Sequence, residues 1–235
     1  MSLLRIHRTP ALLLAAGLAA LNTGCSSRPS PADVLREANE GNTAAQYRYG
    51  IWALTGTKLK ANPQAAVLWL RLAAADLHPE ANTVLGICHL IGKGTDKDEK
   101  LGLSYLKTGA RLGNAPACLT LAYFSQIKGK EGDMVQWIRR AAELGDLPSE
   151  TYIAANILRG EDLGLSPAER IDYLRYAAMD GMPEASYALF LYNLQGIGLP
   201  RNAELATGWL ELAAEQGYSP AKRIIRRLNR GDLEL

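Results

Sequence analysis

The sequence predicts an all-α fold, a solenoid of antiparallel helix pairs stacked in series. An aromatic residue recurs with spacings of 36, 32, 36 and 36 residues, at Trp69, Tyr105, Trp137, Tyr173 and Trp209. An aliphatic residue follows each aromatic, and a pair of small residues begins four positions after it. A glycine then follows in most copies, and Leu77 takes its place once. Several columns that keep one spacing indicate a repeat architecture rather than one globular core.

The repeat divides most of the chain into five units. The predicted units are 41–76, 77–112, 113–144, 145–180 and 181–216. The third unit is four residues shorter than the others, and we place the deletion in a loop between Lys128 and Trp137. Residues 25–40 are expected to form a tether and a first helical turn, and 217–235 a C-terminal capping helix.

The first helix of a unit is predicted from its ends. A proline stands in the expected first turn of most copies, at Pro79, Pro116, Pro148, Pro183 and Pro220. Proline is tolerated there because its missing N–H would have no partner in the helix. Glycines such as Gly92 and Gly196 are expected to end these helices, because glycine adopts left-handed dihedral angles without strain.

The second helix is predicted to begin at a capping residue. Asn62, Asp98, Ser166 and Asn202 stand at that position, where a side-chain oxygen accepts bonds from free N–H groups of the first turn. Ser166 and Glu169 have the spacing of a capping box. The aromatic and the small pair fall on one apolar face. Trp137 is therefore expected to be a core residue whose truncation to Ala costs about 3–5 kcal/mol.

These columns together resemble the Sel1-like repeat, a relative of the tetratricopeptide repeat, over about residues 41–230. In the second unit the resemblance is carried by Ala81, Leu85, Gly86, Gly92, Gly94, Asp98, Tyr105, Leu106, Ala110 and Gly113. It implies a right-handed α-solenoid with the first helices along a concave wall. The family's first-helix tyrosine is replaced in this chain by Ala53, His89, Ser125, Ile157 and Asn193, which puts the family's ligand contacts in doubt.

Residues 1–24 have the features of a signal peptide. Basic residues at Arg5 and Arg8 precede the apolar run 11–21, which is shorter than the about 20 residues that a membrane-spanning helix needs. Residues 21–25 (LNTGC) resemble a bacterial lipoprotein signal, with Asn22 where leucine is usual. The resemblance implies lipidation of Cys25.

This signal implies that the protein is anchored in the outer membrane and faces the periplasm. Ser26, rather than aspartate, follows the cysteine, and in the lipoprotein family this arrangement implies outer-membrane sorting. The alternative is a soluble periplasmic or secreted protein with an unrelated cysteine. In that case the protein would not be attached to a membrane, since no other segment is long and apolar enough to span a bilayer.

Charge gives no support for a nucleic-acid partner. The chain has 26 basic and 24 acidic residues. Removal of Arg5 and Arg8 with the leader leaves 24 basic residues, so the remaining chain is balanced. Binding to a phosphate backbone depends on an excess of basic residues, which this composition lacks.

No catalytic, cofactor-binding or metal-binding site is predicted. Beyond the leader the only histidines are His78, expected to be a helix cap, and His89. Neither has the spaced His or Cys partners of a zinc site. Cys88 is expected to be a packed core thiol. The expected positions of Cys88 and Cys118 along their adjacent helices differ by about 9 Å. This distance is beyond the reach of a disulfide.

The predicted function is a non-catalytic scaffold that binds envelope proteins in the concave groove. The candidate contacts are aromatic residues of the first helices: Tyr47, Trp52, Tyr123, Tyr152, Tyr187 and Tyr192. The alternative is a module that binds cell-wall glycan or peptide, or that regulates a cell-wall enzyme. Exposed aromatic residues in the groove would favour cell-wall material, whereas a charged or aliphatic groove would favour protein partners.

Overall fold

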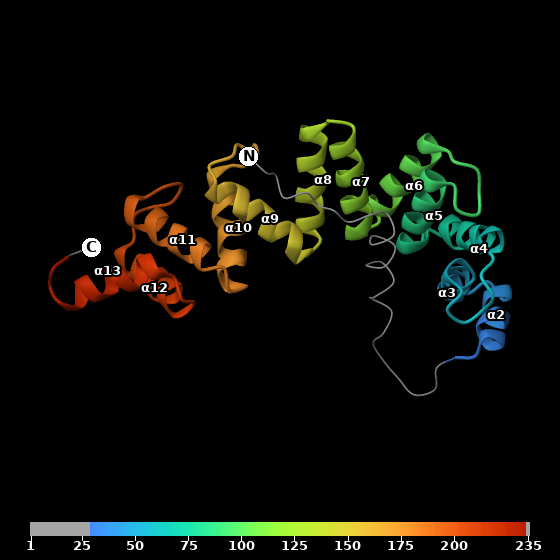
Figure 1. Ribbon diagram of the computed structural model, residues 1–235, viewed down its shortest axis with the longest axis horizontal. Coiled ribbons are helices and arrows are strands. Elements are labelled where there is room, and N and C mark those ends of the chain that lie inside the picture. Colours follow the sequence, from blue (N-terminus) through green and yellow to red (C-terminus); the bar gives the residue numbers. More distant parts are fainter. Residues whose placement is uncertain (1–28, 234–235) are drawn as a thin grey trace. The chain divides into compact units, whose positions relative to one another are not determined.

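The computed structural model describes residues 29–233, and every regular element in that range is an α-helix. Figure 1 shows these helices following one another as antiparallel pairs joined by short connections. The all-α repeat fold predicted from the sequence is therefore confirmed. The predicted leader and Cys25 lie outside the described residues.

The described residues form two compact units, which divide between Leu144 and Gly145. The first contains α2 (Pro31–Asn39), α3 (Thr43–Thr55), α4 (Pro63–Ala75), α5 (Pro79–Ile91), α6 (Glu99–Arg111), α7 (Ala115–Ile127) and α8 (Glu131–Glu143). The second contains α9 (Leu147–Leu158), α10 (Pro167–Met179), α11 (Pro183–Gln195), α12 (Ala203–Glu215) and α13 (Ser219–Asn229). The pairs are α3–α4, α5–α6, α7–α8, α9–α10 and α11–α12.

Helix α2 is longer than the single turn expected before the first unit. It begins at Pro31, where the Ser30 hydroxyl accepts a bond from the Asp33 N–H at 3.2 Å. Val34 and Ala38, four residues apart, are buried against the first pair. A helix with only two core residues has too short an apolar pattern for periodicity to reveal.

The predicted caps are present at the start of the second helices. Asn62, Asp98 and Asn202 each accept a bond from the backbone N–H three residues ahead. Ser166 and Glu169 form the expected capping box. These bonds satisfy N–H groups that a helix cannot pair internally, so the sequence defines where each second helix begins.

The centre of each pair is formed by the aliphatic residue that follows the aromatic column. Leu70, Leu106, Ile138, Leu174 and Leu210 are at most 3% exposed. The five aromatic residues are themselves only half-buried. The expectation of a core Trp137 was therefore wrong. Successive helical residues point about 100° apart, so the aliphatic side chain points into the core while the aromatic ring covers its edge.

Glycine allows a close backbone contact between two helices of the first unit. A Cβ on Gly86 would lie 2.8 Å from the Gly102 carbonyl oxygen, and a Cβ on Gly102 would lie 2.8 Å from the Gly86 carbonyl oxygen. Real Cβ atoms do not approach that closely, so this contact between α5 and α6 requires glycine on both sides. Gly86 and Gly102 thus set the spacing between α5 and α6.

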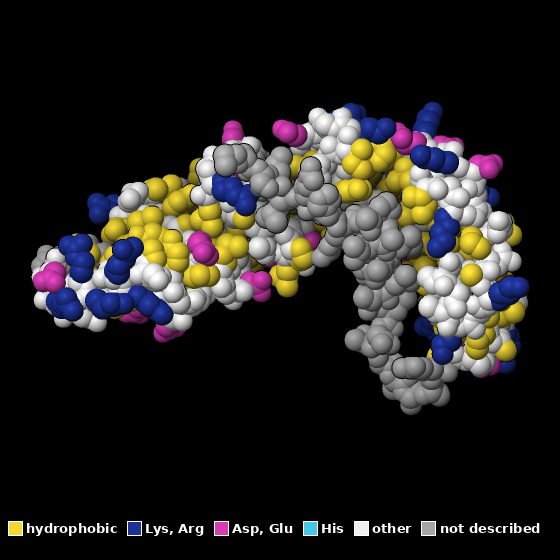
Figure 2. Space-filling model, viewed as in Figure 1, with side chains coloured by type: hydrophobic (Ala, Val, Ile, Leu, Met, Phe, Trp, Pro, Cys, Tyr) yellow, Lys and Arg dark blue, Asp and Glu magenta, His cyan; other side chains and the backbone are white. Residues whose placement is uncertain are grey.

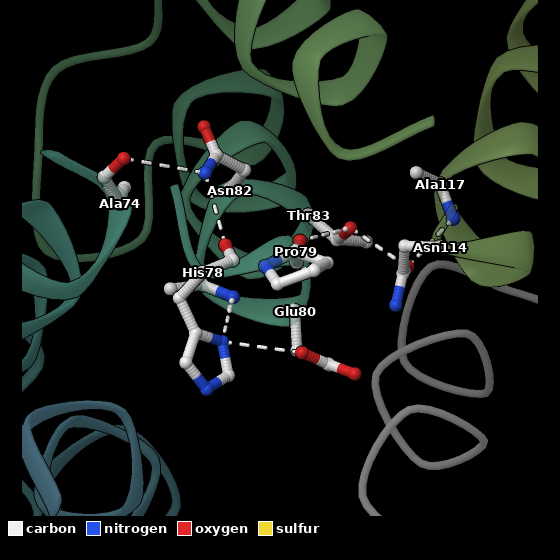
Figure 3. Close-up of polar contacts among 9 residues, drawn as sticks. Ala74, His78, Pro79, Glu80, Asn82, Thr83, Asn114 and Ala117 are labelled. Carbon is white, nitrogen blue, oxygen red and sulfur yellow. Dashed lines mark hydrogen bonds and ion pairs between the residues drawn. The ribbon is translucent and has the colours of Figure 1, made fainter. Parts of the chain in front are cut away.

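Buried polar contacts join successive pairs in the first unit (Figure 3). Thr83 of α5 donates to the side-chain oxygen of Asn114, the residue that caps α7. Asn82 donates to the carbonyl of Ala74, at the end of α4, at 3.4 Å. In the second unit Gln216 donates to the Ala178 carbonyl, at the end of α10, at 2.7 Å. The Ala74 and Ala178 carbonyls also accept from the N–H groups of Leu77 and Gly181, so Asn82 and Gln216 each add a second donor at the end of the preceding helix.

The two histidines occupy different surroundings. His78 caps α5, as expected, and its Nδ1 lies 3.4 Å from the Ala81 nitrogen and 3.1 Å from a Glu80 oxygen. Its ring stacks on Tyr47 with centroids 4.6 Å apart. His89 is 2% exposed and stacks on Tyr105, with no hydrogen-bond partner for either ring nitrogen.

Cys88 and Cys118, the two cysteines within the described residues, are both buried. Cys88 packs in the core of the first two pairs, and burial raises the pKa of its thiol to about 11. A thiol with so high a pKa is a poor nucleophile at neutral pH. The prediction that Cys88 is a packed core thiol is confirmed.

Candidate functional site

The six aromatic residues predicted to contact a partner do not form one surface. Tyr47 is 4% exposed and packs on His78, so it belongs to the core. Trp52 is half-buried against the cluster of Val34 and Ala38. Tyr123, on α7, is half-buried as well. Tyr47 and Trp52 therefore pack within the helix pairs of the first unit.

The remaining three lie in the second unit. Tyr152, Tyr187 and Tyr192 are all half-buried. Tyr187 packs on Phe190 and Tyr218, with ring centroids 5.5 and 5.1 Å away, inside the last hydrophobic cluster. Its ring thus holds α13 to α11, and this contact leaves less of its surface for a ligand.

The first unit carries a groove over α6, α7 and α8. Two adjoining hollows of about 700 and 240 Å³ share Leu103, Lys107 and Trp137 in their walls. Leu103 and Trp137 are half-buried and pack against the core cluster below. In Figure 2, hydrophobic side chains reach the surface over α6 and α7, with Lys and Arg side chains beside them. We refer to this feature as the α6–α8 groove.

One face of α6 supplies a wall of the groove. Lys100, Leu103, Ser104, Lys107 and Arg111 line the larger hollow. Their spacing of three or four residues places them on one stripe of the helix. The opposite stripe, with Gly102 and Leu106, is buried against α5. Because one face packs on α5, the polar stripe is left for the solvent side.

The short connection between α7 and α8 supplies the other end. Helix α7 ends at Ile127 and α8 begins at Glu131, so the four-residue deletion does fall in a loop. Lys128 and Lys130, on either side of the turn, both line the smaller hollow. The Lys128 ammonium lies 5.1 Å from the centre of the Phe124 ring. A seven-residue connection, as in 92–98, would place different side chains here.

The rim of the groove is positively charged. Lys100, Lys107, Arg111, Lys128 and Lys130 line it, against one acidic lining residue, Asp133. Lys128 also pairs with Glu99 at 3.2 Å. Five cations against two carboxylates leave a local excess on a chain whose charges balance beyond the leader. An apolar floor with a charged rim is the arrangement found in protein-binding surfaces.

The sequence contained a signal for this groove that aromatic residues alone did not reveal. Lys100, Lys107 and Arg111 recur at intervals of seven and four residues in a second helix. Such spacing indicates one basic helical stripe. This stripe lies on the second helix of the pair, so it is separate from the aromatic residues of the first helices.

Within residues 29–233, no group of three or more His, Cys, Asp or Glu side chains is arranged to hold a metal ion. Across the same residues, none of the helices combines the length and the hydrophobicity needed to cross a membrane.

The fold and groove define a helix-pair repeat protein, and comparison with known families identifies the repeat. The Sel1 repeat model matches residues 43–76, 79–114, 135–146 and 183–218, about half of the chain. The chain therefore belongs to the Sel1 repeat family. The matches omit α9 and α10 entirely, although these helices form the same kind of pair. Proteins built from this repeat are generally scaffolds for protein–protein interaction.

Two curated relatives are longer proteins. An uncharacterized protein of Neisseria meningitidis is 27% identical over 77% of this chain and 38% of its own length. The chitin synthase regulator SKT5 of Saccharomyces cerevisiae is 26% identical over 83% of this chain and 35% of its own length. The chain thus spans little more than a third of either relative.

Two solved structures share the fold. A protective antigen of uropathogenic Escherichia coli with an SLR fold is 22% identical, with a TM-score of 0.57 over 95% of this chain and 50% of the antigen. A Sel1 repeat protein from Oxalobacter formigenes is 24% identical, with a TM-score of 0.57 over 94% of this chain and 66% of its own. At these identities the likeness concerns the fold alone.

Proposed function

We propose that this protein is a non-catalytic scaffold, held at the bacterial envelope by a lipid on Cys25, that presents the α6–α8 groove to a partner protein. The observation that carries the proposal is the groove itself. It combines an apolar floor at Leu103 and Trp137 with a rim of five cations. Membership of a family of interaction scaffolds supports the same reading.

The proposed location in the envelope is based on the sequence of the leader. Two or three acyl chains on Cys25 would hold the chain on a bilayer, because each buried methylene contributes about 0.8 kcal/mol. Ser26 after the cysteine favours the outer membrane, with the repeat domain in the periplasm. The proposed partners are accordingly proteins of the envelope.

A second candidate is regulation of an enzyme that handles cell-wall material. The name of one relative, a chitin synthase regulator, favours this reading. In that case the enzyme would be the protein that the scaffold holds. Direct binding of a glycan is less favoured, because Trp137 is the only tryptophan that lines the groove while five cations surround it.

Two measurements test the proposal together. The first is metabolic labelling with palmitate, followed by membrane fractionation, of the wild-type chain and the Cys25→Ser variant. We expect a labelled membrane form for the wild type and an unlabelled soluble form for the variant. Label in both forms, or a variant that stays in the membrane fraction, would show that Cys25 is not the anchor.

The second measurement is chemical crosslinking in intact envelopes followed by affinity purification. We expect one or a few defined envelope proteins to copurify with the wild type. Their recovery should fall for Cys25→Ser, which would no longer be held beside them. The absence of any defined partner across repeated preparations would contradict a scaffolding role.

A further inference from the structure

We infer that the α6–α8 groove takes an acidic segment of a partner protein, anchored by an apolar side chain of that segment. This inference rests on the proposed function and adds the chemistry of the partner. It places the anchor on Leu103 and Trp137 and the acidic side chains on the lysines and arginine of the rim.

The floor determines that the occupant carries an apolar group. Leu103 and Trp137 each line the two hollows, and each of these side chains is half-buried. The larger hollow, about 700 Å³, is open to the solvent along one side, so a segment of another protein can reach its floor. A partner side chain bound there would remove apolar surface of both molecules from water. Binding energy in protein interfaces concentrates at such buried apolar contacts.

The rim determines the sign of the occupant's charge. Lys100 and Lys107 are exposed, and neither forms an ion pair with another described residue. Of the rim cations, Lys128 has a carboxylate partner in Glu99. Lys100 and Lys107 are thus available to carboxylates of a ligand, whereas a basic segment would bring like charges together.

The length of the charged stripe limits the size of the segment. Lys100 and Arg111 are eleven residues apart on α6, which corresponds to about 16 Å along the helix. An extended peptide rises about 3.3 Å per residue, so about five residues would span the stripe. A short acidic stretch with one apolar residue near its middle fits the spacing.

A protein segment suits the site better than an anionic membrane. A flat layer of headgroups could meet exposed cations, but it could not place an apolar group on a floor that lies between α6 and α8. The exposed basic residues of α13 offer the contrast: Ile224, Ile225 and Leu228 on that helix already pack on the core. That helix presents charge alone, whereas the groove pairs charge with an apolar floor.

The test is a selection from a phage-displayed library of random 12-residue peptides against the purified full chain carrying Cys25→Ser. We expect the enriched peptides to contain more Asp and Glu than Lys and Arg, with a recurrent large apolar residue. One enriched peptide is then labelled with fluorescein, and its affinity is measured by fluorescence anisotropy at low and at high salt. Binding should weaken as salt screens the charges.

Matched variants locate the binding. Lys100→Glu with Lys107→Glu should weaken the labelled peptide about tenfold or more, and Leu103→Ala should weaken it at all salt concentrations. The control is Lys58→Glu with Lys60→Glu. Both residues are exposed in the connection between α3 and α4, away from the groove, and their replacement changes the net charge by the same amount. This control variant should change the affinity less than about twofold. Circular dichroism checks that each variant is folded.

Several outcomes would overturn the inference. These are a library that yields no binder, enriched peptides without an acidic excess, or an equal loss in the control pair. Binding of phosphatidylglycerol vesicles that depends on Lys100 and Lys107, with no peptide selected, would show a lipid site instead. An envelope partner that still copurifies with the Lys100→Glu, Lys107→Glu variant would leave the proposed function intact and refute only the groove chemistry.

Discussion

The hydroxyl of Thr83 donates a hydrogen bond of 2.8 Å to the side-chain oxygen of Asn114, 31 residues further along the chain. The same Asn114 oxygen accepts a bond from the Ala117 N–H at 3.1 Å and so caps α7. Both side chains are buried. One polar atom therefore both begins a helix and joins it to the preceding pair (Figure 3).

This shared atom predicts coupling between Thr83 and Asn114. Thr83→Val should cost about 1 kcal/mol of unfolding free energy, and Asn114→Ala about 2 kcal/mol because it removes both a cap and a partner. The double variant should cost about 0.5–1 kcal/mol less than the sum. Urea denaturation provides the values. Asn62→Ala is the control, because Asn62 caps α4 without touching Thr83, and it should add to Thr83→Val without coupling.

Leu77 is strained and should be improved by glycine. It is the one described non-glycine residue with positive φ, at 60°, and it stands where the other units have glycine. A left-handed conformation costs an L-residue about 1–2 kcal/mol. Leu77 is 60% exposed, so its side chain contributes little packing. Leu77→Gly should raise the unfolding free energy by about 1 kcal/mol, while Leu77→Ala, which keeps the strain, should not. A destabilised glycine variant would refute this explanation.

Two glycines with the same backbone conformation should respond differently to alanine. Gly94 and Gly160 have φ of 77° and 76°. A Cβ on Gly94 would overlap the Pro63 carbonyl, whereas a Cβ on Gly160 would meet no atom within 4 Å. Gly160→Ala should therefore cost about 1 kcal/mol, and Gly94→Ala about 3 kcal/mol because a steric clash is added. Equal losses of stability for the two variants in thermal or urea unfolding would show that the connection after α5 moves to accommodate the added methyl group at no cost.

Tyr47 should make the protein sensitive to alkali. Burial, followed by the nearby charge of Glu80, raises the pKa of its hydroxyl to about 12. The unfolded chain ionises near pH 10, so between these values the unfolded state loses a proton that the folded state retains. The stability that this contributes is complete below pH 10 and falls at up to about 1.4 kcal/mol per pH unit towards pH 12. Urea unfolding from pH 8 to 12 measures it, with Tyr47→Phe as the comparison. Parallel curves for the two proteins would mean that Tyr47 ionises normally.

The repeat could be predicted because it is local and periodic. Caps such as Asn62 and Ser166 act on N–H groups three residues away, so their role is visible in the sequence. The aromatic column gave the register of the units, and the adjacent column containing Leu106 proved to be the buried one. Periodicity establishes that a face is apolar, but it does not show which of two neighbouring residues points to its centre.

The binding surface could not be predicted in the same way. The residue types predict groove contacts at the aromatic residues of the first helices, but Tyr47 is covered by His78 from the next pair. The α6–α8 groove is made of residues from three helices, and its shape depends on the short turn at 128–130. Such a site arises from packing between pairs, which a list of residue types does not contain.

The most direct test of this account is site-specific photo-crosslinking in intact cells. A photoreactive benzoyl-phenylalanine replaces Ser104, which is exposed in the groove, or Thr57, which is exposed in the loop after α3. We expect a discrete adduct with an envelope protein at Ser104 and none at Thr57. The adduct should disappear when Lys100→Glu and Lys107→Glu are added. Equal labelling at both positions, or a Ser104 adduct that survives the charge reversal, would contradict it.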